Sequence, residues 1–148
     1  MARRVFLARD DGLTVLEPGS NGWVEGARAL EGQSVTTVSA SKYAILAGTR
    51  EGVFVSRDEG RSWEATNRGL TEPHVRWLSY HVDDPWLAFA GTEPAAIFVS
   101  EDRAESWRAC SEVGELRDAN GWYLPYSPEA GCVRGFAFDG LRGYAAVE

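Results

Sequence analysis

Apolar residues in this chain come in short segments separated by polar and turn-forming residues. The segments at 75–80, 86–90, 96–99 and 107–109 have the length and the β-branched and aromatic content of strands, and Asp83-Asp84-Pro85 is typical of a turn. Between the Gly and Pro residues, no stretch of ten residues repeats apolar positions at the three and four spacing of a helix. The pattern therefore predicts an all-β fold.

The sequence also contains an internal repeat. Residues 47–49, 54–56, 58, 62–63 and 65 recur at an offset of 43 and then 44 residues, as 90–92, 98–100, 102, 106–107 and 109. Four short antiparallel strands in a period of about 44 residues are typical of a β-propeller blade. We predict one partial propeller over residues 1–148 with about three and a fraction blades: copies at 5–31, 33–67 and 74–110, an incomplete copy at 132–148, and an insertion loop at 110–132.

An octapeptide of the form S-x-D-x-G-x-S-W lies between the third and fourth strands of one copy, and a second octapeptide follows in the next copy. In such a turn a carboxylate accepts backbone N–H bonds, Gly takes a positive φ, and Trp packs between sheets. The second octapeptide has Ala104 at the Gly position, which predicts a strained or altered turn. The predicted structural residues are Ser56, Asp58, Gly60, Ser62, Trp63, Ser100, Asp102, Ser106 and Trp107.

These octapeptides resemble the Asp-box, or BNR repeat, of sialidase-like β-propellers, and the resemblance covers nearly the entire chain. The chain is similar to the WD40/YVTN/BNR-like repeat proteins that are often labelled glycosyl hydrolases. In that family the boxes are structural elements at the periphery of the blades, so we expect Asp58 and Asp102 to form turns. The resemblance implies a non-catalytic binding or assembly module, or alternatively a sialidase-like glycoside hydrolase. Neither its arginine signature nor any other catalytic motif is found, and no catalytic residue is assigned.

Propeller ligands usually meet the face where one blade connects to the next. Arginines from successive copies reach this face and would suit a carboxylate ligand through bidentate pairing. The long 110–132 loop contributes aromatic residues that suit a sugar or a peptide, although they could equally cover the end of the sheets. The candidate ligand-binding residues are Arg9, Arg50, His74, Arg76, Trp122, Tyr123, Tyr126 and Arg134. Surface arginines that balance the acidic residues are the plainer alternative.

The composition narrows the possible partners. Fifteen basic and 22 acidic residues give a net charge of −7, which argues against nucleic acid or an anionic membrane as partner. The first residues turn polar before a signal-peptide core develops, so we expect a cytoplasmic protein. Cys110 and Cys132 are expected to be reduced thiols, and the sequence predicts no metal site and no cofactor.

The length of 148 residues is less than four periods of the repeat. A closed propeller typically needs at least four blades, and an open arc leaves strand edges and apolar faces in water. We therefore expect a homodimer that closes a ring, in which residues 133–138 of one chain dock beside the 5–28 sheet of the other. The alternative is a truncated or engineered fragment with no activity of its own.

Overall fold

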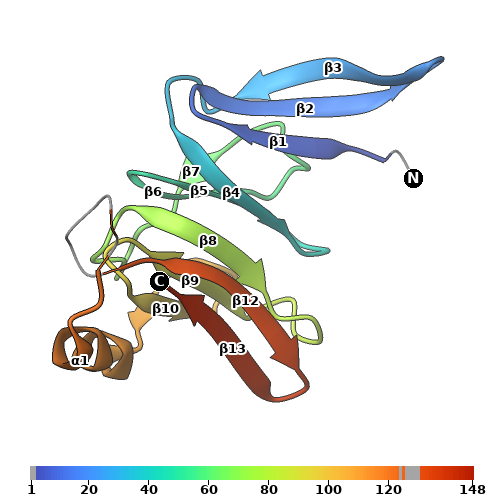
Figure 1. The fold of residues 1–148 in the computed structure, drawn as a ribbon. Helices are drawn as coiled ribbons and strands as arrows, with labels where there is room; N and C mark the ends of the chain where they lie inside the picture. The colour runs from blue at the N-terminus through green and yellow to red at the C-terminus, as the bar shows by residue number, and fades with distance from the viewer. Residues whose placement is uncertain (1–2, 124, 126–130) are drawn as a thin grey trace.

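The computed structural model describes residues 3–123, 125 and 131–148, and these form thirteen strands and one helix (Figure 1). The strands make four antiparallel sheets that follow one another along the chain. The strands are β1 (Val5–Arg9), β2 (Gly12–Gly19), β3 (Gly22–Ala29), β4 (Val35–Ala40), β5 (Ile45–Thr49), β6 (Gly52–Ser56), β7 (Glu64–Ala65), β8 (Val75–Tyr80), β9 (Ala88–Thr92), β10 (Ile97–Ser100), β11 (Arg108–Ala109), β12 (Val133–Asp139) and β13 (Arg142–Val147). The predicted all-β class is confirmed.

Two of the sheets are complete four-stranded units, and they repeat the same register. Sheets β4-β5-β6-β7 and β8-β9-β10-β11 each pair their strands in chain order. The first strand of each carries a register shift just after its opening valine, Val35 in one sheet and Val75 in the other. Val133 opens β12 with the same shift, so β12 is equivalent to a first strand and β13 to a second strand.

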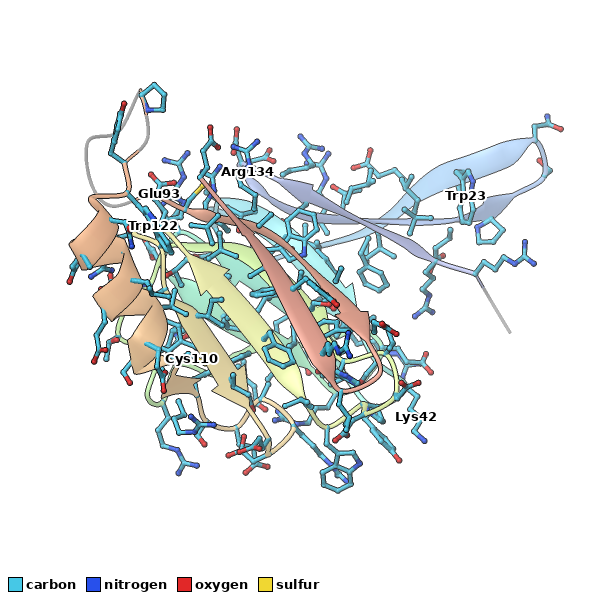
Figure 2. All side chains as sticks on the ribbon, turned by 60° about the horizontal axis from the view of Figure 1, so that its bottom comes forward. Trp23, Lys42, Glu93, Cys110, Trp122 and Arg134 are labelled. Carbon is cyan, nitrogen blue, oxygen red and sulfur yellow. The ribbon has the colours of Figure 1, made fainter. Side chains whose placement is uncertain are left out.

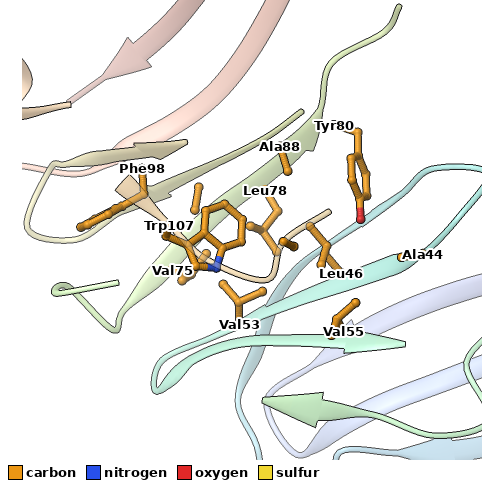
Figure 3. Close-up of a cluster of buried hydrophobic side chains, with 12 residues drawn as sticks. Ala44, Leu46, Val53, Val55, Val75, Leu78, Tyr80, Ala88, Phe98 and Trp107 are labelled. Atoms are coloured by element: carbon orange, nitrogen blue, oxygen red, sulfur yellow. The ribbon is translucent and has the colours of Figure 1, made fainter. Parts of the chain in front are cut away.

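The sheets pack face to face around a core of small and β-branched residues. β4 and β5 pack against β8, and β8 and β9 pack against β12. Between the two complete sheets, Leu46, Val53, Val75 and Phe98 are at most 1% exposed (Figure 3). Burying side chains of this size contributes roughly 1.5 to 3 kcal/mol each, so this contact stabilises the fold. Gly48 lies at a close approach in this contact, where an added Cβ would stand 2.7 Å from Val75 Cγ1.

The first sheet, β1-β2-β3, lacks an equivalent of the first strand among the described residues. β1 packs against β4 as β5 packs against β8, which identifies β1 as a second strand. A two-residue turn joins Arg9 to Gly12 in the same way that Thr49 is joined to Gly52. β2 and β3 extend away from the other sheets as a long hairpin (Figure 1). Sheets of three, four, four and two strands therefore follow one another.

The predicted docking of residues 133–138 on a second copy has a structural requirement. β13 already pairs along β12, from Val133↔Val147 to Asp139↔Arg142. That is the edge of β12 that a strand equivalent to β5 or β9 would use. Pairing of β12 with β1 of another chain would therefore require β13 to move.

The region predicted as an insertion loop contains a helix, α1 (Ser111–Asn120). It ends at Gly121, whose left-handed conformation (φ 60°) suits a glycine at a helix C-terminus. None of its residues is buried, and Arg117 Nη1 donates to the carbonyl oxygen of Ala95 at 3.4 Å. Because the helix is polar on all sides, it has no apolar period of three and four, and the sequence pattern could not reveal it. Within the described residues, no helix has the length and apolar character needed to cross a membrane.

Candidate functional site

The first octapeptide forms a turn held by the carboxylate of Asp58. Asp58 Oδ1 accepts hydrogen bonds from Ser56 Oγ and from the Ser62 amide, both at 2.8 Å, and Oδ2 accepts one from Ser62 Oγ at 2.6 Å. The side-chain bond from Ser62 is the largest of several bonds that lower the pKa of Asp58 to about 2. These hydrogen bonds all come from residues of the same turn, so the Asp58 carboxylate stabilises that turn.

The second octapeptide keeps this arrangement with alanine in place of glycine. Asp102 accepts bonds from Ser100 Oγ at 2.8 Å and from the Ser106 amide at 2.9 Å. Burial acts to raise the pKa of Asp102, but these hydrogen bonds outweigh it and the pKa is lowered. Ala104 is buried and takes a φ of 63°, so the turn retains its shape at the expense of backbone strain. The sequence predicted this strain.

The tryptophans of the octapeptides pack toward the preceding sheet. Trp107 is 4% exposed, and its Nε1 donates to the Thr66 carbonyl oxygen at 2.8 Å, across the sheet boundary. Trp63 packs on the cluster formed by Leu13 and its neighbours. Trp23, which the sequence aligns with Trp63, lies farther out in the first sheet, because it pairs with Pro18 near the tip of the longer β2–β3 hairpin. It is 51% exposed on this protruding hairpin (Figure 2).

A groove of about 420 Å³ opens at the end of the sheets where β4, β8 and β12 begin. Three of the predicted arginines line it, Arg50 from the β5–β6 turn, Arg76 from β8 and Arg134 from β12. Its other lining residues are Asp10, Ser34, Val35, Thr36, Trp77 and Val133. The size is that of a small-ligand or short-peptide site. In Figure 2, Arg134 and Glu93 lie toward this end, and Lys42 lies toward the other.

Charge at the groove is partly neutralised within the chain. Arg76 Nη1 lies 3.2 Å from Glu93 Oε2, and Arg134 Nη1 lies 2.7 Å from Glu148 Oε2. Among the described residues, no carboxylate lies within ion-pair distance of the exposed Arg50 side chain. Arg50 therefore has its guanidinium donors available to a ligand.

His74 lies beside the groove rather than in its lining. Its Nδ1 is 3.9 Å from Glu93 Oε2, and its Nε2 is buried without a hydrogen-bond partner among the described residues. Burial lowers the pKa of His74; Glu93 opposes this change, and Arg76 and Arg50 add to it. The imidazole is therefore neutral at neutral pH and supplies no positive charge for a ligand.

The other candidate residues lie apart from the groove. Arg9 pairs with Asp11 of its own turn, Nε to Oδ1 at 3.0 Å. Trp122 is half-buried and Tyr123 is 66% exposed; both follow α1, and neither lines the groove. Tyr126 lies outside the described residues.

Asp10, Ser34 and Glu93 were not predicted as site residues. Asp10 occupies the place in its turn that Arg50 occupies in the next sheet, and its Oδ1 accepts a bond from Ser34 Oγ at 3.3 Å. The strand register of the two turns shows this equivalence, whereas residue types alone do not.

Burial raises the pKa of the free thiols of Cys110 and Cys132, so neither is a thiolate at neutral pH. Within the described residues, no cluster of three His, Cys, Asp or Glu side chains is placed to hold a metal ion.

An aromatic cluster lies where β4 and β5 are joined. Arg103 stacks on Trp86, with its guanidinium carbon 3.4 Å from the ring centroid, and lies 5.1 Å from that of Tyr43. Tyr43 and Trp86 meet edge to face at 5.9 Å. This cluster connects the two complete sheets. The Arg103 guanidinium already makes cation–π contacts within the chain.

Solved structures similar to this chain are β-propellers. A structure of "YCF48 bound to D1 peptide" matches with a TM-score of 0.56 and 19% identity, over 72% of this chain and 35% of that one. PorZ, described as a surface component of the type-IX secretion system of Porphyromonas gingivalis, matches with a TM-score of 0.56 and 18% identity, over 72% of this chain and 14% of that one. YCF48 from Cyanidioschyzon merolae matches with a TM-score of 0.52 and 17% identity, over 94% of this chain and 48% of that one.

This chain has a β-propeller fold. It spans less than half the length of each of these three propellers. No protein-family model matches the sequence, and no curated protein matches it. At 17 to 19% identity the similarity establishes the fold alone.

Proposed function

We propose that this chain is a non-catalytic propeller module of the Asp-box type that binds a carboxylate-bearing polypeptide segment in the arginine groove. The observation that carries the proposal is the exposed, uncompensated Arg50 beside Arg76 and Arg134. The peptide-bound state of one similar propeller supports a peptide as ligand. The saturated Asp58 and Asp102 support the Asp-box assignment, in which these residues hold turns.

A free C-terminal carboxylate is the ligand group that best fits Arg50. A guanidinium can donate two parallel bonds to a carboxylate. The Ser34 and Thr36 hydroxyls already donate within the chain, so they offer neighbouring peptide groups only acceptor lone pairs. Asp10 would disfavour a segment with several negative charges. The ligand is therefore a segment with one carboxylate at its end, and its affinity should fall as salt rises.

An array of decapeptides tests this proposal when each peptide is made with a free C-terminal carboxylate and with a C-terminal amide. We expect the protein to select free carboxylates, and Arg50→Gln to weaken that binding by about 10- to 100-fold, the range of a charge-assisted hydrogen bond. Arg28→Gln is the matched control, because Arg28 pairs with Glu25 on β3 outside the groove. Equal binding of acids and amides, or equal losses in both variants, would contradict the proposal.

The alternative of a sialidase-like hydrolase has weaker support in the groove. Most glycoside hydrolases use two carboxyl groups about 5 to 10 Å apart across one pocket, whereas sialidases use a tyrosine nucleophile. The groove has no tyrosine in its lining as described. Asp10 is the single carboxylate in the lining as described, and Glu93 and Glu148 beside it are held by arginines. A fluorogenic sialoside is the decisive probe: turnover that disappears in Arg50→Ala or Arg134→Ala would replace the binding proposal with the hydrolase.

We also infer that two copies associate through their end sheets. Val5 and Leu7 are 37% and 39% exposed at one end of the array, and Tyr144 and Val147 are 53% and 36% exposed at the other. Packing of these faces removes apolar surface from water without displacing β13. Light scattering should give the mass of a dimer, and Leu7→Glu should convert it to a monomer. A monomeric mass for the unmodified chain at high concentration would rule out this association.

A further inference from the structure

β1 is an open edge in the part of the chain that the structure describes. In the complete sheets a first strand covers the equivalent edge, so β4 pairs with β5 and β8 pairs with β9. The edge of β1 that does not pair with β2 has no partner strand among the described residues. An open edge of this kind accepts an extended segment of polypeptide.

The backbone groups available on β1 follow from its turn. Arg9 and Gly12 close a two-residue hairpin, and such a pair exchanges both of its hydrogen bonds across the hairpin. Hydrogen-bonded pairs alternate along an antiparallel ladder, so Arg9, Leu7 and Val5 bond to β2. The amides of Ala8 and Phe6 therefore point to the open edge.

Hydroxyl groups on the first strands supply the chemistry that an added segment needs. The amide of Leu78 donates to Thr37 Oγ1 at 3.4 Å, and the amide of Tyr80 donates to Ser39 Oγ at 3.2 Å. The hydroxyls of Thr37 and Ser39, two residues apart on β4, thus accept hydrogen bonds from amides on the edge of β8 that does not pair with β9. On β4, Val38 and Ala40 are equivalent to Leu78 and Tyr80 of β8. Among the described residues, no side-chain acceptor is found for the amides of Val38 and Ala40.

We propose that the edge of β1 is a docking site for an extended segment of another polypeptide that carries Thr or Ser at two alternating positions. The segment would pair with β1 and accept the Val38 and Ala40 amides through its hydroxyls, as β4 does for β8. β12 of a second copy does not fit this description. It has Gly135 and Ala137 at the equivalent positions, and β13 already occupies its pairing edge. This site is separate from the arginine groove and does not depend on the function proposed for it.

A synthetic peptide of residues 33–42, which holds the β4 sequence, is the probe. We expect it to bind the unmodified protein and to slow hydrogen exchange at the amides of Phe6 and Ala8. A peptide with Thr37→Val and Ser39→Ala should bind at least about tenfold more weakly, because it lacks both hydroxyl acceptors. A peptide of residues 132–139 should bind as weakly as that variant.

Backbone methylation of the peptide gives a matched pair of controls. The amide at the Thr37 position faces β1, so its N-methylation should abolish binding, whereas N-methylation at the Val38 position should have little effect. In the protein, Ala8→Pro removes one amide from the open edge and should also abolish binding. If Ala8→Pro does not fold, the peptide pairs decide alone.

Three results would overturn the proposal. The first is the absence of binding by the 33–42 peptide, and the second is equal binding by the peptide without hydroxyls. The third is faster exchange at the Thr37 and Ser39 amides without protection of Phe6 and Ala8, since this would mean that the peptide had replaced the chain's own β4.

Discussion

The hydroxyls of β4 make a testable contribution to the contact between the two complete sheets. Thr37 is 8% exposed, and Leu78, whose amide donates to Thr37 Oγ1 at 3.4 Å, is 3% exposed. Valine has nearly the shape of threonine, so Thr37→Val removes the acceptor without opening a cavity. The Leu78 amide is then buried without a partner.

Leaving a buried donor unsatisfied costs about 1 to 3 kcal/mol. A separation of 3.4 Å is at the long end for an N–H···O bond, so we expect Thr37→Val to lower the free energy of unfolding by about 1 kcal/mol. Ser39→Ala should cost about as much, since its bond from the Tyr80 amide is shorter at 3.2 Å but Ser39 is less buried. The double variant should lose about 2 kcal/mol if the two bonds act independently.

Urea unfolding measures these losses, and an unchanged m-value will show that the denatured state is unaffected. Native-state hydrogen exchange should accelerate at Leu78 in Thr37→Val and at Tyr80 in Ser39→Ala. Ser79→Ala is the control, because its hydroxyl donates to the Tyr80 carbonyl oxygen within its own strand; we expect a change below about 0.5 kcal/mol. Wild-type stability in Thr37→Val together with unchanged exchange at Leu78 would refute the role assigned to these hydroxyls.

Two further predictions concern the octapeptide turns. Ser62→Ala should raise the pKa of Asp58 from about 2 toward its ordinary value of 3.8, measured by NMR titration of the carboxyl carbon. Because the pKa of Asp58 is depressed in the folded state, its ionised carboxylate stabilises the fold above about pH 3.8, and this stabilisation is lost as the pH falls through about 2. The free energies of unfolding of wild type and variant should therefore converge at the lower pH. An unchanged pKa of Asp58 would exclude the Ser62 bond as the cause of the depression. Gly60→Ala places a Cβ 2.7 Å from the ring of Phe6 at a φ of 88°, and should cost about 2 to 4 kcal/mol in urea unfolding. Ala104→Gly, at the same place in the second turn, should change stability by about 1 kcal/mol or less, since relief of the positive φ offsets the lost buried methyl group; equal effects at the two positions would contradict this account.

Local turn chemistry made most of the fold predictable. The Asp58 and Asp102 turns require particular residues within eight positions, so their recurrence at a fixed offset reveals the repeat and its strands. Two features depend on contacts that sequence does not encode locally. The α1 helix is exposed and has no apolar stripe, and the β2–β3 hairpin continues to Gly19↔Gly22, which leaves Trp23 51% exposed near its tip.

The candidate site could be predicted only where its residues occupy equivalent positions in successive sheets. Arg76 and Arg134 follow the opening valines of β8 and β12, so their first strands bring them to one groove, which Arg50 reaches from its turn. Arg9 does not line the groove, because it lies one position earlier than Arg50 relative to the hairpin and Asp10 takes the equivalent place.

The groove and the open edge of β1 are adjacent, which gives the two proposals a common consequence. β1 ends at Arg9, and Asp10 directly after it lines the groove. A first strand runs antiparallel to the second, so the opening residues of a docked segment would lie beside Arg9, as Val35 lies beside Thr49. Val35 and Thr36 themselves line the groove, and the docked segment would extend its wall in the same way. A carboxylate-ending peptide should therefore bind more tightly when the 33–42 peptide is present, and by linkage each should strengthen the other by the same factor.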